Sequence, residues 1–294
     1  MKPKSEGPEE RTIRARRCTA GALAIAAAVA LASMGAAPSA LASSAVKEEF
    51  APFADCPVES AAVCVLATTT GGEFVLGRKA VTIDKTITLQ GGLASHAVTA
   101  QPLIGAADGN TLSHTPLTVP GGLVGIEGLG GEVTATAELA GPPSSVIISE
   151  AGFVFGQEPA VTLPLKVKLS NEVLGEDCYI GSDAEPIVLH LTTGTTSPPS
   201  PTQPIKGSKG TFAGEDKNRI GTFQNTSLVD NDFAVPGASG CGGELSPLVD
   251  LAVDADVGLP ASAGQSTAIM NGTLAETSAE LAKKYLPKQK KKKK

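Results

Sequence analysis

The stretch Val161-Thr-Leu-Pro-Leu-Lys-Val-Lys-Leu-Ser170 decides the fold class, because apolar and polar side chains alternate along it. Successive side chains of a β-strand point to opposite faces of a sheet, so this pattern predicts a strand with one face in a core and the other in water. Pro164 cannot donate a hydrogen bond to a neighbouring strand. We therefore expect this strand to lie at a sheet edge or to carry a bulge.

Further strands are predicted on both sides of this stretch. Residues 81–89 and 133–139 show the same alternation, and short apolar runs at 146–148, 187–189 and 268–270 are typical of buried strands. Pairs of turn-forming residues separate these segments, and they include Gly71-Gly72, Gly91-Gly92, Gly121-Gly122 and Asn271-Gly272. Many short strands with frequent turns predict a mainly β protein, an antiparallel β-sandwich or barrel-like domain.

Two short helices are expected near the C-terminus. Ser246-Pro247 is a helix start, and the helix should end before Gly258. A second helix should run from about Thr277 to Leu286. The proline-rich stretch 197–204 predicts an extended connector. We interpret it as a long loop within one β-rich domain of residues 43–282, with a boundary between two domains as the alternative.

Composition and the N-terminus indicate export. The 294 residues include 33 Gly and 21 Pro but no Trp, and 41% are hydrophobic, which is too apolar for a wholly disordered chain. Arg16-Arg17 precede an uncharged run, and Ala40-Leu41-Ala42 supplies small residues for a signal peptidase. We predict a signal peptide over 1–42, cleaved after Ala42. The twin-arginine export route and an uncleaved membrane anchor are the alternatives.

Four cysteines remain after residue 42, an even number that predicts two disulfides in an exported chain. Three pairings are possible. We favour Cys56–Cys64, because the two residues are close in sequence and flank a turn at Pro57, and hence Cys178–Cys241. A metal site is disfavoured, because the spacings are not those of zinc motifs and no histidine lies near any cysteine.

Charge is distributed unevenly along the chain. Residues 43–282 carry 10 basic and 27 acidic residues, whereas 8 lysines lie in 283–294. Such a charge run predicts a disordered polylysine tail that is attracted to anionic surfaces, formed by Lys288, Lys290, Lys291, Lys292, Lys293 and Lys294. Anionic cell-wall polymers or lipid headgroups are the partners we expect for an exported protein, and nucleic acid is not expected. A tail that only faces solvent is the alternative.

No catalytic motif stands out in the sequence. G-x-S-x-G, H-E-x-x-H and P-loop patterns are missing, and His96, His114 and His190 are isolated from one another. His190 is expected as a packed or surface strand residue, and the other two as solvated loop residues. The pairs Asp230/Asp232 and Asp254/Asp256 lack the pattern of a calcium loop, so we interpret them as incidental surface pairs, with a weak calcium site as the alternative. We therefore predict no catalytic residue, no metal and no cofactor, and a role that is not enzymatic.

The glycine-rich, apolar segment 119–131 has two interpretations. It could contact lipid or a hydrophobic partner, or it could be a crossover packed on the core. We favour the crossover, because Glu127 lies in the middle of the segment.

Several motifs resemble a group of uncharacterised exported proteins of high-GC Gram-positive bacteria. They are Cys178-Tyr-Ile-Gly-Ser182, the segment 186–194, Gly240-Cys-Gly-Gly243 and the segment 258–273. The resemblance spans roughly residues 72–275, supports export and the Cys178–Cys241 pairing, and implies no activity. We therefore expect a secreted or cell-envelope protein of structural or binding type. An extracellular hydrolase whose site forms only in the fold, and a lipid-contacting or pore-forming protein acting through 119–131, are the alternatives.

Overall fold

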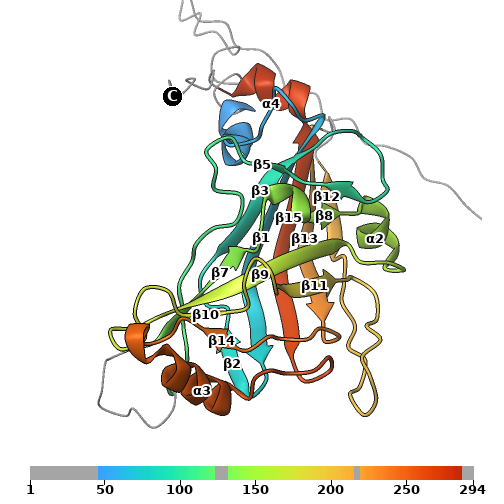
Figure 1. Ribbon diagram of the computed structural model, residues 1–294. Coiled ribbons are helices and arrows are strands. Elements are labelled where there is room, and N and C mark those ends of the chain that lie inside the picture. The colour runs from blue at the N-terminus through green and yellow to red at the C-terminus, as the bar shows by residue number, and fades with distance from the viewer. Residues whose placement is uncertain (1–45, 123–131, 215–218, 287–294) are drawn as a thin grey trace, which may run out of the picture.

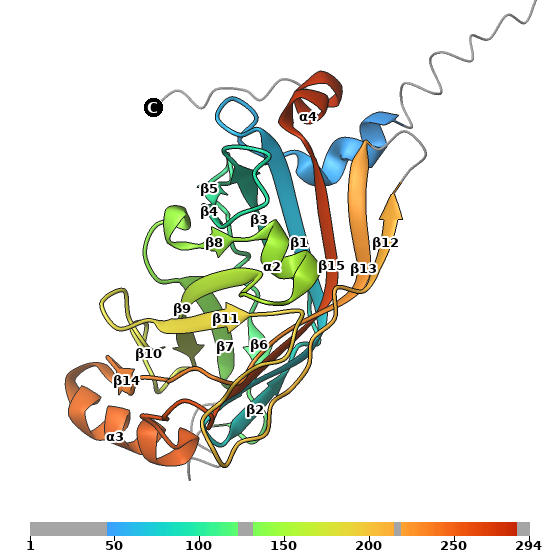
Figure 2. The same ribbon diagram turned by 90° about the vertical axis from the view of Figure 1, so that its right-hand side faces the viewer.

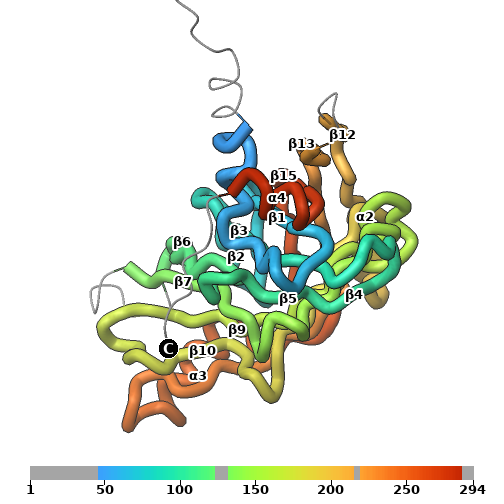
Figure 3. The backbone as a smooth tube through the Cα atoms, turned by 90° about the horizontal axis from the view of Figure 1, so that it is seen from above, coloured from blue at the N-terminus to red at the C-terminus, as the bar shows by residue number. Residues whose placement is uncertain are grey.

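The computed structural model describes residues 46–122, 132–214 and 219–286 (Figure 1). Two antiparallel sheets pack as a sandwich rather than as one closed barrel, which confirms the mainly β prediction. Figure 3 shows the two layers from above, with β7, β9 and β10 on one side and β1 and β3 on the other. The predicted signal peptide lies outside the described residues.

Long strands build the first sheet, in the order β12-β13-β15-β1-β3-β5, and β2 pairs with the far end of β1. Their bounds are β1 (Val63–Leu76), β2 (Lys79–Thr82), β3 (Ile87–Leu93), β5 (Ile104–Gly105), β12 (Thr211–Gly214), β13 (Ile220–Asp230) and β15 (Thr267–Ser278).

The second sheet is centred on β9, which crosses the long strands of the first sheet (Figure 2). Its main order is β14-β10-β9-β7-β6; β11 and β8 also pair with β9, and β4 pairs with β8. The bounds are β4 (Gln101–Pro102), β6 (Leu117–Thr118), β7 (Thr134–Leu139), β8 (Ile147–Ile148), β9 (Val161–Ser170), β10 (Tyr179–Ile180), β11 (Ile187–Leu191) and β14 (Ala238–Ser239).

The strand with Pro164 is therefore central, and the expectation of an edge strand or bulge is wrong. β11 pairs with residues 161–165 on one edge of β9. On the other edge, β7 pairs with residues 165–170 and β8 with 161–162. The Pro164 carbonyl accepts a hydrogen bond from the Ala140 N–H at 3.0 Å, one residue beyond the end of β7. The missing proline N–H thus lies where one partner strand ends and the next begins, so no ladder bond is lost.

Several glycines predicted to form turns lie inside the long strands instead. Gly71-Gly72 belongs to β1, Gly91-Gly92 to β3 and Gly272 to β15, whereas Gly121 does lie in a turn. A Cβ atom on Gly272 would lie only 1.8 Å from the Thr68 carbonyl oxygen. The registers of both β1 and β13 shift opposite this residue. These glycines therefore allow close backbone approach and bulges that bend the sheet.

Both predicted C-terminal helices are present. α3 (Ser246–Val257) ends at Gly258, which adopts the left-handed conformation with φ 81°. α4 (Ala279–Tyr285) begins two residues later than expected, because Ser278 ends β15 and its hydroxyl caps the helix by accepting from the Glu280 N–H at 3.3 Å. α3 and α4 lie at opposite ends of the long strands (Figures 1 and 2).

Other helical segments were not predicted. α2 (Glu150–Phe155) begins at Ser149, whose hydroxyl accepts from the Gly152 N–H at 3.0 Å. Short 3₁₀ turns occupy Ala51–Phe53, Pro143–Ser145 and Gly243–Leu245, and residues 46–50 are helical. In the described part of the chain, no helix has the length and apolar character needed to span a membrane.

The two disulfides have the pairing that the sequence favours. Cys56 is bonded to Cys64, within a small apolar cluster of residues at the α4 end of the molecule that also contains Phe50, Ile220 and Ala282. Cys178 is bonded to Cys241, beside the paired strands β10 and β14 near α3. Two disulfides indicate an oxidising, extracellular environment.

Candidate functional site

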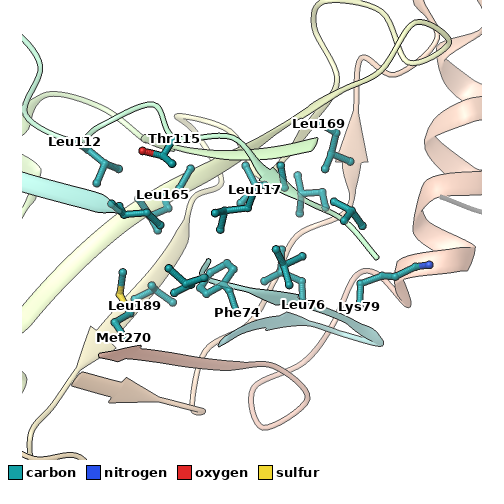
Figure 4. A pocket seen from close by; sticks show the side chains of 18 of the residues that line it. Phe74, Leu76, Lys79, Leu112, Thr115, Leu117, Leu165, Leu169, Leu189 and Met270 are labelled. Atoms are coloured by element: carbon teal, nitrogen blue, oxygen red, sulfur yellow. The ribbon is translucent and has the colours of Figure 1, made fainter. Parts of the chain in front are cut away.

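The space between the two sheets is not completely filled. A cavity of about 80 Å³ lies there, between residues of β1, β2 and β15 on one side and β7, β9 and β11 on the other (Figure 4). Among the described residues that line it, only Lys79 and Thr115 have polar side chains. The walls are mainly Leu, Val and Ile, which are the inward residues of the alternating strands.

Small residues on β7 explain why space remains. β9 contributes Leu163, Leu165, Val167 and Leu169 to the cavity wall, in agreement with its alternation. The inward positions of β7 that pair with Val167 and Leu169 are Ala137 and Ala135. An alanine side chain ends at Cβ, so it cannot reach across to the first sheet.

Lys79 lies at one end of this cavity. Its aliphatic stem lines the wall, and its ammonium group points away from the apolar side chains toward α3 (Figure 4). The Lys79 Nζ atom is 2.8 Å from Asp256 Oδ2 and donates to the Gly122 carbonyl oxygen at 3.1 Å. An amphipathic lysine thus closes an apolar space with a charged, partly exposed end.

A second cavity of about 110 Å³ lies on the other side of Met270. It is bordered by β1, β13 and β15 of the first sheet, and by α2 and β8. Met270 lines both cavities, so its side chain separates them. Methionine is unbranched and has three rotatable bonds, which makes it an adaptable partition.

A polar surface cleft of about 300 Å³ adjoins the second cavity, and Glu150 and Glu276 line both. Burial raises the pKa of Glu276, and the negative charge of Glu150 raises it further. Burial also raises the pKa of Glu150, against the opposing effect of His96. His96 and Arg219 line the same cleft, and Arg219 Nη2 is 3.1 Å from Glu49 Oε2. Two carboxyl groups therefore mark the boundary between apolar interior and polar surface.

The three histidines lie in separate places. His96 and His114 are exposed residues outside strands, and His190 is an exposed residue of β11. Within the described residues, no group of three or more His, Cys, Asp or Glu side chains is placed to hold a metal ion.

The acidic pairs are not incidental surface pairs, so that interpretation is wrong. Asp230 is only 2% exposed, and its carboxylate accepts from the His190 N–H at 2.6 Å and the Asp232 N–H at 2.8 Å. It thereby joins β13 of one sheet to β11 of the other. Asp254 accepts from the Ala238 N–H at 2.7 Å, and Asp256 pairs with Lys79. Each of these carboxylates satisfies a backbone donor or a cation of another segment.

The remaining predicted features fall largely outside the described residues. This applies to Lys288, to Lys290–Lys294 and to residues 123–131 of the glycine-rich segment. Val119 of that segment is buried and lines the first cavity. Lys283, also part of the basic C-terminus, belongs to α4 and pairs with Glu59 at 2.8 Å.

Sequence reasoning did not identify either cavity or the Glu150–Glu276 pair. The available signal was the run Ala135-Thr-Ala137, which places two small residues on an inward strand face. We find no match to this chain among known protein families, curated proteins or solved structures. The resemblance to uncharacterised exported proteins of high-GC Gram-positive bacteria therefore stays a prediction.

Proposed function

We propose that this protein is an exported binding protein that holds a flexible apolar ligand, such as an acyl chain, between its two sheets. The observation that supports this proposal is the apolar cavity of about 80 Å³ beside Ala135 and Ala137. An apolar cavity of about 150 Å³, roughly the size of this cavity and its neighbour together, stays dry and accepts benzene. Ligand sites commonly combine apolar walls with a few polar groups, and here the Lys79 ammonium group lies at the end of the apolar space.

A linear ligand fits the arrangement better than a bulky ring system. The two cavities, of about 80 and 110 Å³, meet at Met270, whose side chain can change rotamer. A chain that displaces this side chain would extend from the Lys79 end toward Glu150 and Glu276. We therefore expect affinity to rise with chain length up to the length that fills both cavities.

Displacement of a fluorescent fatty acid by saturated fatty acids of increasing length tests this proposal. Ala137→Val reduces the space, so we expect affinity to fall by about tenfold, or about 1.4 kcal/mol. Ala80→Val is the matched control, because Ala80 is an exposed residue of neighbouring β2. Met270→Ala should favour the longer chains. Equal binding by wild type and Ala137→Val, or no binding by the wild type, would contradict the proposal.

We also propose that the polylysine tail tethers the protein to anionic cell-wall polymers or lipid headgroups. Each lysine near an anionic membrane contributes about 1 kcal/mol, an attraction that salt weakens. The test is fractionation of native cells. Release by a high-salt wash, with a mass that begins at Ser43, supports both the tether and the cleavage site. Free protein in the medium contradicts the tether, and release only by detergent with an intact N-terminus contradicts cleavage.

An extracellular hydrolase is the second candidate, and one observation favours it. Glu150 and Glu276, both with raised pKa values, face a polar cleft together with His96. Carboxyl groups of this kind act as general acids and bases. A screen of the purified protein with glycoside and ester substrates tests this function. Activity that Glu276→Gln abolishes would support it, and inactivity toward both classes counts against it.

A further inference from the structure

The helix α3 turns apolar side chains to the solvent and acidic side chains to the protein, which is the reverse of an ordinary surface helix. Its exposed residues are all apolar: Pro247, Leu248, Leu251, Ala252 and Ala255. Leu248 is 70% exposed and Leu251 is 66% exposed. Leu245, just before the helix, is 62% exposed. A surface helix normally turns its leucines to the core and its charges to water.

The acidic residues of α3 face the protein instead and fix the helix in place. Asp250 accepts from the Cys241 N–H at 2.8 Å and from the Ser246 hydroxyl at 2.6 Å. Asp254 accepts from the Ala238 N–H at 2.7 Å, as described above. Asp256 pairs with Lys79 at 2.8 Å. Turning the leucines inward would break all of these interactions, so the exposed apolar face is built into the fold.

α3 also lies beside the first cavity. Val257, on its inner side, lines that cavity, and the Val257 carbonyl oxygen accepts from the Arg78 N–H at 2.7 Å. The helix is at the end of the molecule opposite α4 (Figures 1 and 2). The exposed leucines therefore stand at the Lys79 end of the space between the sheets.

We propose that the outer face of α3, with Leu245, Leu248 and Leu251, docks on the surface of a lipid bilayer. A stable protein dimer buries roughly 800 Å² and 20–30 residues per partner, which is far more than these few side chains supply. Interfacial binding to lipid has no such minimum area and scales with the apolar area that is buried. The exposed positions of α3 carry no charge, whereas Glu244 beside Leu245 is exposed and the body is acidic, so the surface it fits is neutral rather than anionic.

Docking does not depend on the ligand proposed above. If both hold, the leucines place the Lys79 end of the cavity at the lipid surface. A failure of fatty-acid binding would leave docking untouched, and a failure of docking would leave binding in solution untouched.

Flotation of the purified protein with phosphatidylcholine vesicles tests docking. We expect the wild type to float with the vesicles, and Leu248→Asp/Leu251→Asp to lower the bound fraction by about tenfold or more. Phe155→Asp is the matched control, because Phe155 is 72% exposed on α2, away from α3. Both sites are exposed, so the thermal midpoints should stay unchanged and report that the variants fold.

Several results would overturn the proposal. They are absence of wild-type flotation, equal flotation of the double variant, equal loss in Phe155→Asp, and a wild-type dimer in light scattering that the double variant abolishes. Binding that requires phosphatidylglycerol and disappears in high salt would also overturn it, because such binding would belong to the lysine tail.

Discussion

Substitution of Ala137 by Val measures whether the space beside β7 is empty. The change adds two carbons at a position that lines the cavity of about 80 Å³. Burying them contributes up to ~1.6 kcal/mol at ~0.8 kcal/mol per carbon. A cavity of this volume costs about 2 kcal/mol in total at ~24 cal/mol per Å³. We therefore expect Ala137→Val to raise the free energy of unfolding by about 1 kcal/mol.

Urea unfolding of the oxidised protein is the appropriate assay, with the slope of the transition compared between variants. Valine also favours strands for reasons unrelated to the cavity, and Ala80→Val in β2 measures that contribution at an exposed site. The stabilisation due to the cavity is the difference between the two variants. Destabilisation of Ala137→Val by about 1–3 kcal/mol would indicate overpacking and would refute an empty space between the sheets.

Three further predictions concern the disulfides, the buried aspartate and the carboxyl pair. Replacing Cys178 and Cys241 by Ser should lower the free energy of unfolding by about 4 kcal/mol. The same replacement of Cys56 and Cys64 should lower it by only about 2.6 kcal/mol, because that disulfide closes a shorter loop. Urea unfolding that ranks the two pairs in reverse order would contradict this. Asp230→Ala leaves the His190 and Asp232 N–H groups without their acceptor, so the free energy of unfolding should fall by about 2–4 kcal/mol. Hydrogen exchange at the His190 amide should become faster. Unchanged exchange would show that the hydrogen bond from His190 to Asp230 contributes little. Burial raises the pKa of Glu276 in the folded state, so the unfolded chain loses this proton first as the pH rises above 4.5. The free energy of unfolding of the wild type should therefore fall as the pH rises from 4.5 through the raised pKa. Glu276→Gln should be more stable than the wild type at pH 7 and should lose this advantage below pH 4.5.

The strands could be predicted because their signal is local. The alternation from Val161 to Leu169 corresponds to the burial pattern of β9, and the Ser246-Pro247 start and the Gly258 stop correspond to α3. Pro164 and Gly272 could not be interpreted correctly from the sequence. Whether Pro164 loses a hydrogen bond depends on where β7 ends, and whether Gly272 turns or bulges depends on the Thr68 backbone beside it.

The candidate site was less accessible to sequence reasoning. The alternation over 133–139 places Ala135 and Ala137 on one face of a strand, but an alanine leaves a cavity only if no larger side chain from the opposite sheet fills the space. Glu150 and Glu276 are 126 residues apart in the chain, and their shared position depends on how α2 lies against β15. The outward leucines of α3 follow an ordinary helical spacing, so only the contacts of its aspartates show which face is inside.

The covalent cross-links have a mechanical consequence. Cys56–Cys64 ties a loop to β1 of the first sheet, and Cys178–Cys241 ties the ends of β10 and β14 in the second, so neither bond connects the two layers. Backbone hydrogen bonds between Thr192 and Val229, both 3.0 Å, join the layers along one margin. The layers are also joined where Leu103 links β4 of the second sheet to β5 of the first. Because neither disulfide crosses between the layers, a separation of the two sheets would leave both bonds intact, and we expect a guest molecule to enter or leave without a reducing agent.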